Sequence, residues 1–221
     1  MLSKKKIVVT ACLLGLGCFI PSAAKADTVT FIGAGPNQAN GVYVTPYQLQ
    51  VSSINGGATI NVICDDYTDE VKNGEAPWTA SIETVANIAG ALFAGQANAQ
   101  QNYDEAAYLY NSYLMNPTAA NAIADNFAIW DLFDPSVGAN AVTGEQAALT
   151  AASGWYAGGA TGINFSQFLI ITPTNWSNDA NQPQEYIYDP TPTPEPGTLA
   201  MFGSGLLGLA GILRRKLVSN S

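Results

Sequence analysis

The chain has 221 residues, with 17 acidic and 8 basic side chains and a formal net charge of −9 at pH 7. Such a negative chain repels the phosphate backbone, which excludes nucleic acid as a partner. The chain contains no histidine, which excludes Ser-His-Asp hydrolysis, Cys-His proteolysis and histidine-ligated zinc or haem.

The first 26 residues have the pattern of a secretory signal peptide. Three lysines at positions 4–6 precede an apolar segment at 7–20. Ala24 and Ala26 then flank Lys25 in an A-x-A cleavage site. We therefore expect an exported protein whose mature chain begins near Asp27.

Residues 27–189 are expected to form one acidic domain, long enough to bury a core of its own. Its first third has the alternation and residue types of β-strands. The predicted strands are 29–32, 41–45, 47–53 and 58–64. A turn at Asn55-Gly56-Gly57 joins the last two as a hairpin. Alternation with period two places Ile60, Val62 and Cys64 on one face of the last strand.

The middle third changes to helical spacing. Four helices are predicted: one through Ile82, Val85, Ala89 and Leu92, one through residues 106–114, one over 118–133, and one from the capping-box sequence Thr143–Gln146 to Gly158. Strands return at 165–172 and 186–188, and 173–184 is predicted to be a loop. This grouping indicates an α+β fold, an antiparallel sheet or sandwich with an inserted or covering helical layer.

The C-terminal end has three parts. A proline-rich spacer at 190–197 contains Pro194, Glu195 and Pro196, and prolines favour an extended chain. An apolar segment at 198–213 follows, about 16 residues against the ~20 usually needed to span a bilayer. A basic tail at 214–221 begins with Arg214-Arg215-Lys216, which acts as a membrane stop and keeps the C-terminus cytoplasmic. An ordinary tail anchor is one interpretation.

Together the three parts resemble the PEP-CTERM sorting signal of bacterial surface proteins over residues 192–216. The resemblance implies that a membrane exosortase recognises the tail and processes the chain near Pro194-Glu195-Pro196. It also implies transient anchoring in the inner membrane. The final location is then the cell surface or the extracellular matrix, with exopolysaccharide or other surface components as partners.

Processing at both ends would change the charge of the protein. Lys72 would be the one basic residue left among 17 acidic ones, a net charge of −16. Such a charge keeps a secreted domain soluble and attracts cations or basic partners. Asp65, Asp66, Asp69 and Glu70 cluster after the predicted strand 58–64, where they form either a Ca²⁺ site or a solvated acidic loop. No cofactor is indicated.

Cys64 would be the one cysteine of the mature chain, because Cys12 and Cys18 lie in the predicted signal peptide. A single cysteine excludes an intramolecular disulfide. A buried thiol, an intermolecular disulfide and an internal crosslink all remain open.

The segments 63–67 and 127–134 resemble the paired signatures of bacterial surface thioester domains. In that family a strand cysteine forms a thioester with a glutamine four residues before a tryptophan, and a partner's amine opens it. Cys64 and Trp130 match, but the glutamine position is Asn126, whose side chain is one methylene shorter. Gln146 is an alternative acyl donor, although a capping role explains it as well.

Three function classes follow. The leading prediction is a non-enzymatic, exosortase-sorted surface or extracellular-matrix protein with a structural or adhesive role. The alternatives are a covalent adhesin that uses Cys64 and a carbohydrate-active enzyme that uses a pair of carboxyl groups.

Overall fold

Strands are present where 29–32, 47–53 and 58–64 were predicted, and they close into a barrel with strands from later in the chain. The computed structural model describes residues 26–72, 74–174 and 182–190. The barrel strands are β1 (Asp27–Ala34), β4 (Tyr47–Val51), β5 (Thr59–Cys64), β6 (Trp78–Thr84), β7 (Leu169–Pro173) and β8 (Tyr186–Tyr188). Their order is β1-β4-β5-β8-β7-β6, every pair is antiparallel, and β1 pairs with β6 to close the sheet.

The strand predicted at 41–45 is shorter and lies outside the barrel. It contributes β3 (Val42–Tyr43), which pairs with β2 (Gln38–Ala39) in a small separate hairpin. Asn40 and Gly41 form the turn with positive φ angles of 50° and 84°, a conformation that asparagine and glycine tolerate best. The predicted turn at Asn55–Gly57 is confirmed, as a 3₁₀ turn between β4 and β5.

The helix predicted through Ile82 and Leu92 is wrong. The structure has β6 at Trp78–Thr84, followed by turns up to the first helix. Along its length β6 pairs first with β1 and then with β7, from Asp27↔Ala80 to Thr84↔Leu169. These pairings with distant strands outweigh the local spacing of apolar residues.

The other three predicted helices are present as α1 (Ala99–Met115), α2 (Ala119–Phe133) and α3 (Glu145–Ala157). Thr118 caps α2, because its hydroxyl accepts a hydrogen bond from the Asn121 amide at 3.2 Å. The predicted capping box of α3 is wrong. Gly144, with a φ of 94°, is the N-cap residue, and the Glu145 carboxylate accepts instead from the Val142 amide at 2.8 Å.

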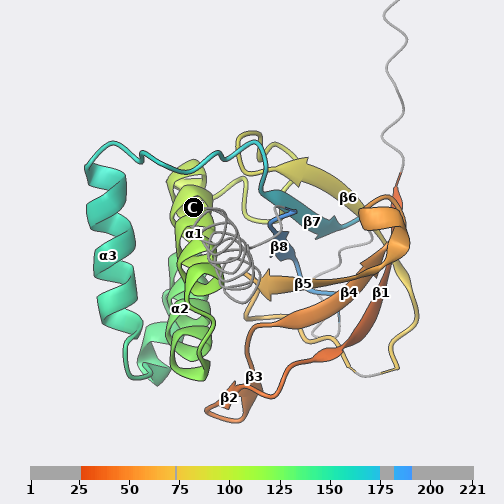
Figure 1. Ribbon diagram of the computed structural model, residues 1–221, viewed down its shortest axis with the longest axis horizontal. Coiled ribbons are helices and arrows are strands. Elements are labelled where there is room, and N and C mark those ends of the chain that lie inside the picture. Colours follow the sequence, from red (N-terminus) through yellow and green to blue (C-terminus); the bar gives the residue numbers. More distant parts are fainter. Residues whose placement is uncertain (1–25, 73, 175–181, 191–221) are drawn as a thin grey trace, which may run out of the picture.

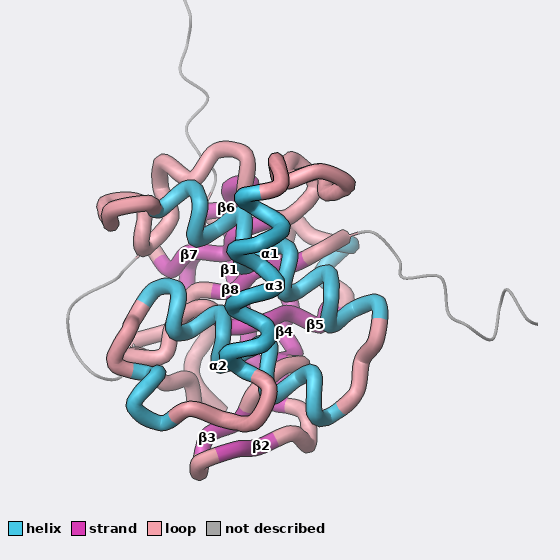
Figure 2. The backbone as a smooth tube through the Cα atoms, turned by 90° about the vertical axis from the view of Figure 1, so that its left-hand side faces the viewer, coloured by secondary structure: helices cyan, strands magenta, loops and turns pink. Residues whose placement is uncertain are grey.

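The helices are inserted between β6 and β7 and cover one side of the barrel (Figure 1). Helices α1 and α2 pack against each other, α2 contacts β5, and α3 packs on α1 and α2. Seen from the helical side, the helices lie in front of the strands (Figure 2). The predicted inserted, covering helical layer on an antiparallel sheet is therefore confirmed, with a closed barrel instead of a sandwich.

The sheet has a buried core on each face. Cross-strand partners share a face, so the pairs Cys64↔Tyr186 and Tyr186↔Ile171 place these three side chains together. The neighbouring pairs Ile63↔Ile187 and Ile187↔Ile170 belong to the opposite face. Tyr103 of α1 reaches a residue of that second face, Glu185. The second face is therefore the one under the helices.

The predicted traffic signals lie almost entirely outside the described residues. This holds for residues 1–25 and 191–221, which include Ala24, the PEP sequence, the apolar segment and the basic tail. Ala26 is exposed, and β1 begins at Asp27, directly after the predicted cleavage site. In the part of the chain that is described, no helix has the length and hydropathy needed to cross a bilayer.

Candidate functional site

Cys64 ends β5 with its side chain completely buried as a free thiol. The thiol donates a hydrogen bond to the Asp66 carbonyl oxygen, with an Sγ–O distance of 3.0 Å. Burial, together with the nearby Asp66 and Asp65 carboxylates, raises the pKa of this thiol well above its ordinary value. Because the thiolate is the nucleophilic form, Cys64 is poorly reactive in the folded protein.

Asn126 of α2 lies directly beside the end of β5, so the structure brings the two predicted crosslink positions together. Its Nδ2 donates to the Cys64 carbonyl oxygen at 2.9 Å, and its Oδ1 accepts from the Thr45 amide at 2.8 Å. Both ends of the amide are thus bonded to the main chain, which ties α2 to the end of β5 and to the segment that precedes β4. Gln146 is exposed on α3, the helix that packs on the other two helices.

A pair of carboxyl groups lies under the helices, next to Cys64 in sequence. Asp65 and Glu185 are both 0% exposed, and the Asp65 amide donates to the Glu185 carbonyl oxygen at 3.4 Å. The Glu185 carboxylate accepts hydrogen bonds from the hydroxyls of Tyr103 and Thr172 and from the Leu92 amide, the last at 2.7 Å. The Asp65 carboxyl group lies within hydrogen-bonding reach of the Glu185 carboxyl group, and its oxygens accept no well-formed hydrogen bond from a donor among the described residues.

Burial raises the pKa of both members of this pair, and the negative Glu185 raises the pKa of Asp65 further. The three donors on Glu185 act in the opposite direction and favour its ionised form. Two carboxylates this close and this dry cannot both be charged. We infer that the pair retains one proton at neutral pH, carried by Asp65.

The other predicted acidic residues hold a tight loop after β5. The Asp66 Oδ1 accepts from the Thr68 amide at 3.0 Å, from the Thr68 hydroxyl at 2.9 Å and from the Asp69 amide at 3.3 Å. Gln184 Nε2 donates to the carbonyl oxygens of Asp66 and Asp69 at 2.9 and 2.7 Å. These bonds fix the first turn of the loop, residues 66–69, and hold it against Gln184.

The four residues predicted to bind Ca²⁺ do not converge. Asp65 lies beside Glu185, Asp66 and Asp69 are buried in the loop, and Glu70 is exposed. Within residues 26–72, 74–174 and 182–190, no group of three or more cysteine, aspartate or glutamate side chains is arranged to hold a metal ion. The other interpretation was a solvated acidic loop, and of the four residues only Glu70 is exposed as that interpretation requires.

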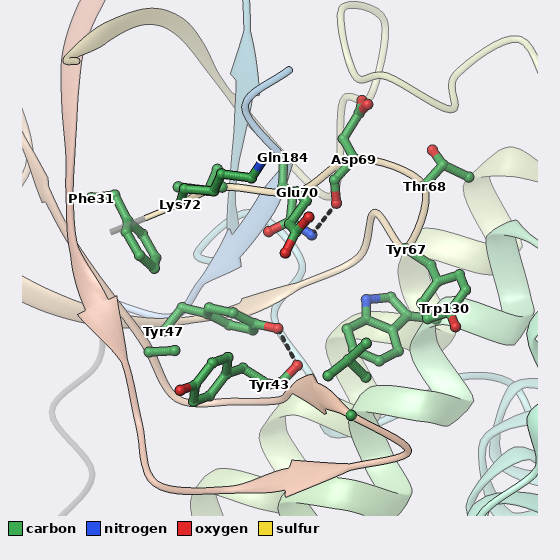
Figure 3. Close-up of a pocket in the computed structure, with 14 residues that line it drawn as sticks. Phe31, Tyr43, Tyr47, Tyr67, Thr68, Asp69, Glu70, Lys72, Trp130 and Gln184 are labelled. Atoms are coloured by element: carbon green, nitrogen blue, oxygen red, sulfur yellow. Dashed lines mark hydrogen bonds between the residues drawn. The ribbon is translucent and has the colours of Figure 1, made fainter. Parts of the chain in front are cut away.

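A cavity of about 530 Å³ opens at the mouth of the barrel, between the β2–β3 hairpin, the loop after β5 and α2 (Figure 3). Its walls combine aromatic, apolar and charged side chains from segments far apart in the sequence. It is lined by Phe31, Ala34, Gly41, Val42, Tyr43, Tyr47, Tyr67, Thr68, Asp69, Glu70, Val71, Lys72, Trp130 and Gln184.

Hydrogen bonds and ring contacts hold the aromatic wall in place. The Tyr47 hydroxyl donates to the Tyr43 carbonyl oxygen at 2.5 Å, which joins β4 to the hairpin. The ring of Tyr67 packs on Trp130 with centroids 5.1 Å apart. Trp130 is 2% exposed, and its indole N–H makes no well-formed hydrogen bond but lies close enough to the Cys64 sulfur to oppose the rise in the pKa of that thiol. The prediction that Trp130, Phe127 and Phe133 are core residues is confirmed, and Trp130 lines the cavity as well.

A second cavity, of about 470 Å³, lies where β5 meets α1 near the end of the barrel. Tyr110, Leu114, Tyr188 and Pro190 line it together with residues of the turn before β5. The Tyr110 hydroxyl donates to the Asn61 carbonyl oxygen at 2.9 Å, which joins α1 to β5 at this cavity.

Comparison with known proteins places the chain in a class through its tail. Residues 192–216 match the PEP-CTERM protein-sorting motif, the same residues on which the sequence resemblance rests. The tail therefore carries a PEP-CTERM sorting motif, which supports export and sorting to the cell surface by an exosortase. No curated protein and no solved structure is significantly similar to it.

Sequence reasoning did not single out Glu185 or Tyr103. A signal for Glu185 existed, since alternation in β8 places it on the same face as Ile187, the face buried by the helices. The aromatic wall formed by Tyr43, Tyr47 and Tyr67 was also missed. These residues come from three different segments, so no local pattern connects them.

Proposed function

We propose that the mature protein is a non-enzymatic component of the cell surface or extracellular matrix, with a structural or adhesive role. The observation that carries the proposal is the sorting motif at residues 192–216, attached to a well-packed acidic domain. The motif accounts for the route, and the domain is the part that remains after processing.

The route has four predicted steps. The signal peptide directs export and is removed between Ala26 and Asp27. The apolar segment at 198–213 then holds the chain in the inner membrane, with Arg214, Arg215 and Lys216 on the cytoplasmic side. The exosortase recognises Pro194-Glu195-Pro196, and processing releases the domain to the surface or the matrix. The start of β1 at Asp27 supports this order, because removal of residues 1–26 leaves every barrel strand intact.

The burial of the carboxyl pair supports a non-enzymatic role. Asp65 and Glu185 have the raised pKa values that accompany acid–base catalysis, but both are fully buried. Neither lines the 530 Å³ or the 470 Å³ cavity. A carboxyl group that a substrate does not reach contributes to folding and pH response instead of turnover.

Fractionation of cells tests the sorting part of the proposal. We expect the wild-type protein outside the inner membrane, and we expect it to remain in the inner membrane when the exosortase is deleted. Replacing Glu195 and Pro196 by alanine should reproduce that retention, whereas the matched change Asn220→Ala, beyond the motif, should not. Normal release of the Glu195→Ala, Pro196→Ala variant would contradict the proposal.

An activity panel tests the non-enzymatic part. The mature protein is incubated with α- and β-linked polysaccharides, and the reducing ends released are counted. We expect no turnover. Hydrolysis that disappears in Asp69→Asn or Glu70→Gln, while the circular dichroism spectrum stays unchanged, would show a carbohydrate-active enzyme.

A further inference from the structure

We propose that the 470 Å³ cavity where β5 meets α1 binds residues 191–194 of the chain's own proline-rich spacer. The occupant is thus a named segment of this chain that lies outside the described residues. The binding itself is argued from the cavity and from the sequence of the spacer, and only its consequence for sorting rests on the proposed function.

The chain leads directly into this cavity. Pro190 is the last described residue of the domain, and it lines the cavity together with Tyr188 and Asp189. Residue 191 is joined to this wall by a peptide bond. The residues that follow are therefore present at the cavity at a high effective concentration, which a separate partner does not have.

The sequence of the spacer restricts its conformation. Proline occupies every second position from 190 to 196, and each proline also disfavours the helical conformation for the residue before it. Residues 191–194 therefore favour the extended polyproline II conformation, which has no internal hydrogen bonds. Because Pro192 and Pro194 have no N–H, the segment offers mainly carbonyl acceptors and apolar rings. A site for it must supply hydrogen-bond donors and apolar walls.

The cavity supplies both. Tyr188 and Leu114 line it and are partly exposed, so that an aromatic and an aliphatic side chain are open to a ligand. Proline-rich segments dock in aromatic-lined grooves of this kind. Asn55 and Asn61 also line the cavity and are exposed. Each carries a side-chain amide with two N–H donors, which suits a segment rich in carbonyl acceptors.

Charge limits the bound segment to the first part of the spacer. Residues 191–194 are uncharged, so Asp189 in the cavity wall does not repel them. Glu195 is negative, and like charges at close range repel. At ~3.1 Å per residue, residues 191–194 span about 12 Å in the polyproline II conformation. This length carries Glu195 away from Asp189 and out of the cavity.

The entropic cost of this contact is low on both sides. The hydrogen bond from the Tyr110 hydroxyl to the Asn61 carbonyl oxygen already holds α1 against β5 at the cavity. The spacer is restricted by its prolines before it binds. Binding therefore requires little further ordering of the chain.

Binding of the spacer also fixes the position of the sorting motif, which is the part of the inference that rests on the proposed function. Pro194-Glu195-Pro196 begins at the last bound residue, so the motif is held beside this end of the barrel. The exosortase then approaches the domain from this end. After processing, the same contact keeps the new C-terminal residues packed on the domain.

Nitrogen-15 relaxation of the chain with its tail, purified in detergent from cells that lack the exosortase, tests the inference. Thr193 is the reporter, because it has an amide N–H and lies inside the bound segment. We expect an order parameter for this amide close to the ~0.85 of rigid backbone. We also expect nuclear Overhauser contacts between the Thr193 methyl group and the side chains of Leu114 or Tyr188.

Leu114→Asn removes an apolar wall of the cavity and should lower the Thr193 order parameter below about 0.6, the range of flexible backbone. Met115→Asn is the matched control, because Met115 is the next residue of α1, is 73% exposed and does not line the cavity. It should behave like wild type. Asn61 is exposed, so Asn61→Ala keeps the test valid if Leu114→Asn does not fold, and it should also lower the order parameter.

The inference is overturned if the wild-type Thr193 amide has an order parameter below about 0.6, or if neither Leu114→Asn nor Asn61→Ala lowers it. Ordering that appears only at high protein concentration would place the spacer of a second copy in the cavity and would also overturn it. Normal sorting with a flexible Thr193 overturns this inference alone, whereas failed sorting overturns the proposed function.

Discussion

Replacing Asp65 by asparagine should flatten the loss of stability that rising pH causes in this domain. In the wild type, Asp65 and Glu185 are buried side by side and retain one proton. Asparagine has nearly the same shape, and its amide donates a hydrogen bond to Glu185 without a titratable proton. The variant keeps the contact and removes one of the two titrating groups, so that the dependence of stability on pH becomes weaker.

The size of the effect follows from the proton count. In the unfolded chain the ordinary pKa values are about 3.9 for aspartate and 4.3 for glutamate, so both groups are ionised at neutral pH. The raised pKa values in the folded state mean that its stability is fully present below about pH 4 and is lost as pH rises through the folded value. One extra proton in the folded state makes that loss about 1.4 kcal/mol per pH unit.

Asp125 allows the contribution of the pair to be separated. Burial raises the pKa of Asp125 to about 6, so its contribution to the slope ends near that pH. Above pH 6.5, the difference in slope between wild type and Asp65→Asn reports on the Asp65–Glu185 pair.

Urea unfolding at half-unit steps from pH 6.5 to 8.5 measures the slope. We expect wild type and the control Asp125→Asn to lose stability in parallel, and Asp65→Asn to lose less than half as much per pH unit. Equal slopes for wild type and Asp65→Asn would refute the assignment of the proton to this pair.

Three further changes test the buried contacts. Glu185→Ala leaves the Tyr103 and Thr172 hydroxyls and the Leu92 amide without an acceptor. At ~1–3 kcal/mol for each group, it should lower the free energy of unfolding in urea by several kcal/mol. A loss below about 1 kcal/mol would contradict this network. Asn126→Ala removes both hydrogen bonds from the Asn126 side chain to the main chain and should lower the free energy of unfolding by about 2–4 kcal/mol. The control Asn121→Ala, on the same helix, should lower it less. Equal losses in the two variants would contradict the role of Asn126 in holding α2 to the barrel. Cys64 should resist iodoacetamide in the native protein and react fully in denaturant, at the full theoretical mass; a mass deficit of about 17 Da would instead indicate a thioester.

The sequence predicted those parts of the fold that depend on local pattern. Helices α1 and α2 show a sustained helical period, and the Asn55-Gly56-Gly57 turn sets the register of β4 and β5. Closure of the barrel was not predictable in this way. It depends on the pairing of β1 with β6 and of β5 with β8, strands separated by many residues. The same non-local pairing explains why β6 was mistaken for a helix.

The candidate site shows the same division. Alternation placed Cys64 on one face with Ile60 and Val62, and the resemblance pointed to Asn126, which the structure places beside the Cys64 carbonyl group. The structural role of Asn126 could not be predicted from the sequence, because its side chain bonds to the backbone of Thr45 and Cys64, which are distant in the chain. The acidic run after β5 looked uniform, yet Asp65 and Glu70 face different environments. That difference arises only from the packing of β8 and the helices.

The mass of the mature protein tests the central claim most directly. The chain is recovered from outside the inner membrane, and both of its ends are assigned by intact mass and peptide mapping. The account predicts an N-terminus at or near Asp27 and a C-terminus close to Pro194-Glu195-Pro196, with residues 198–216 absent. A released protein that retains residues 198–216 in cells with an active exosortase would contradict the account.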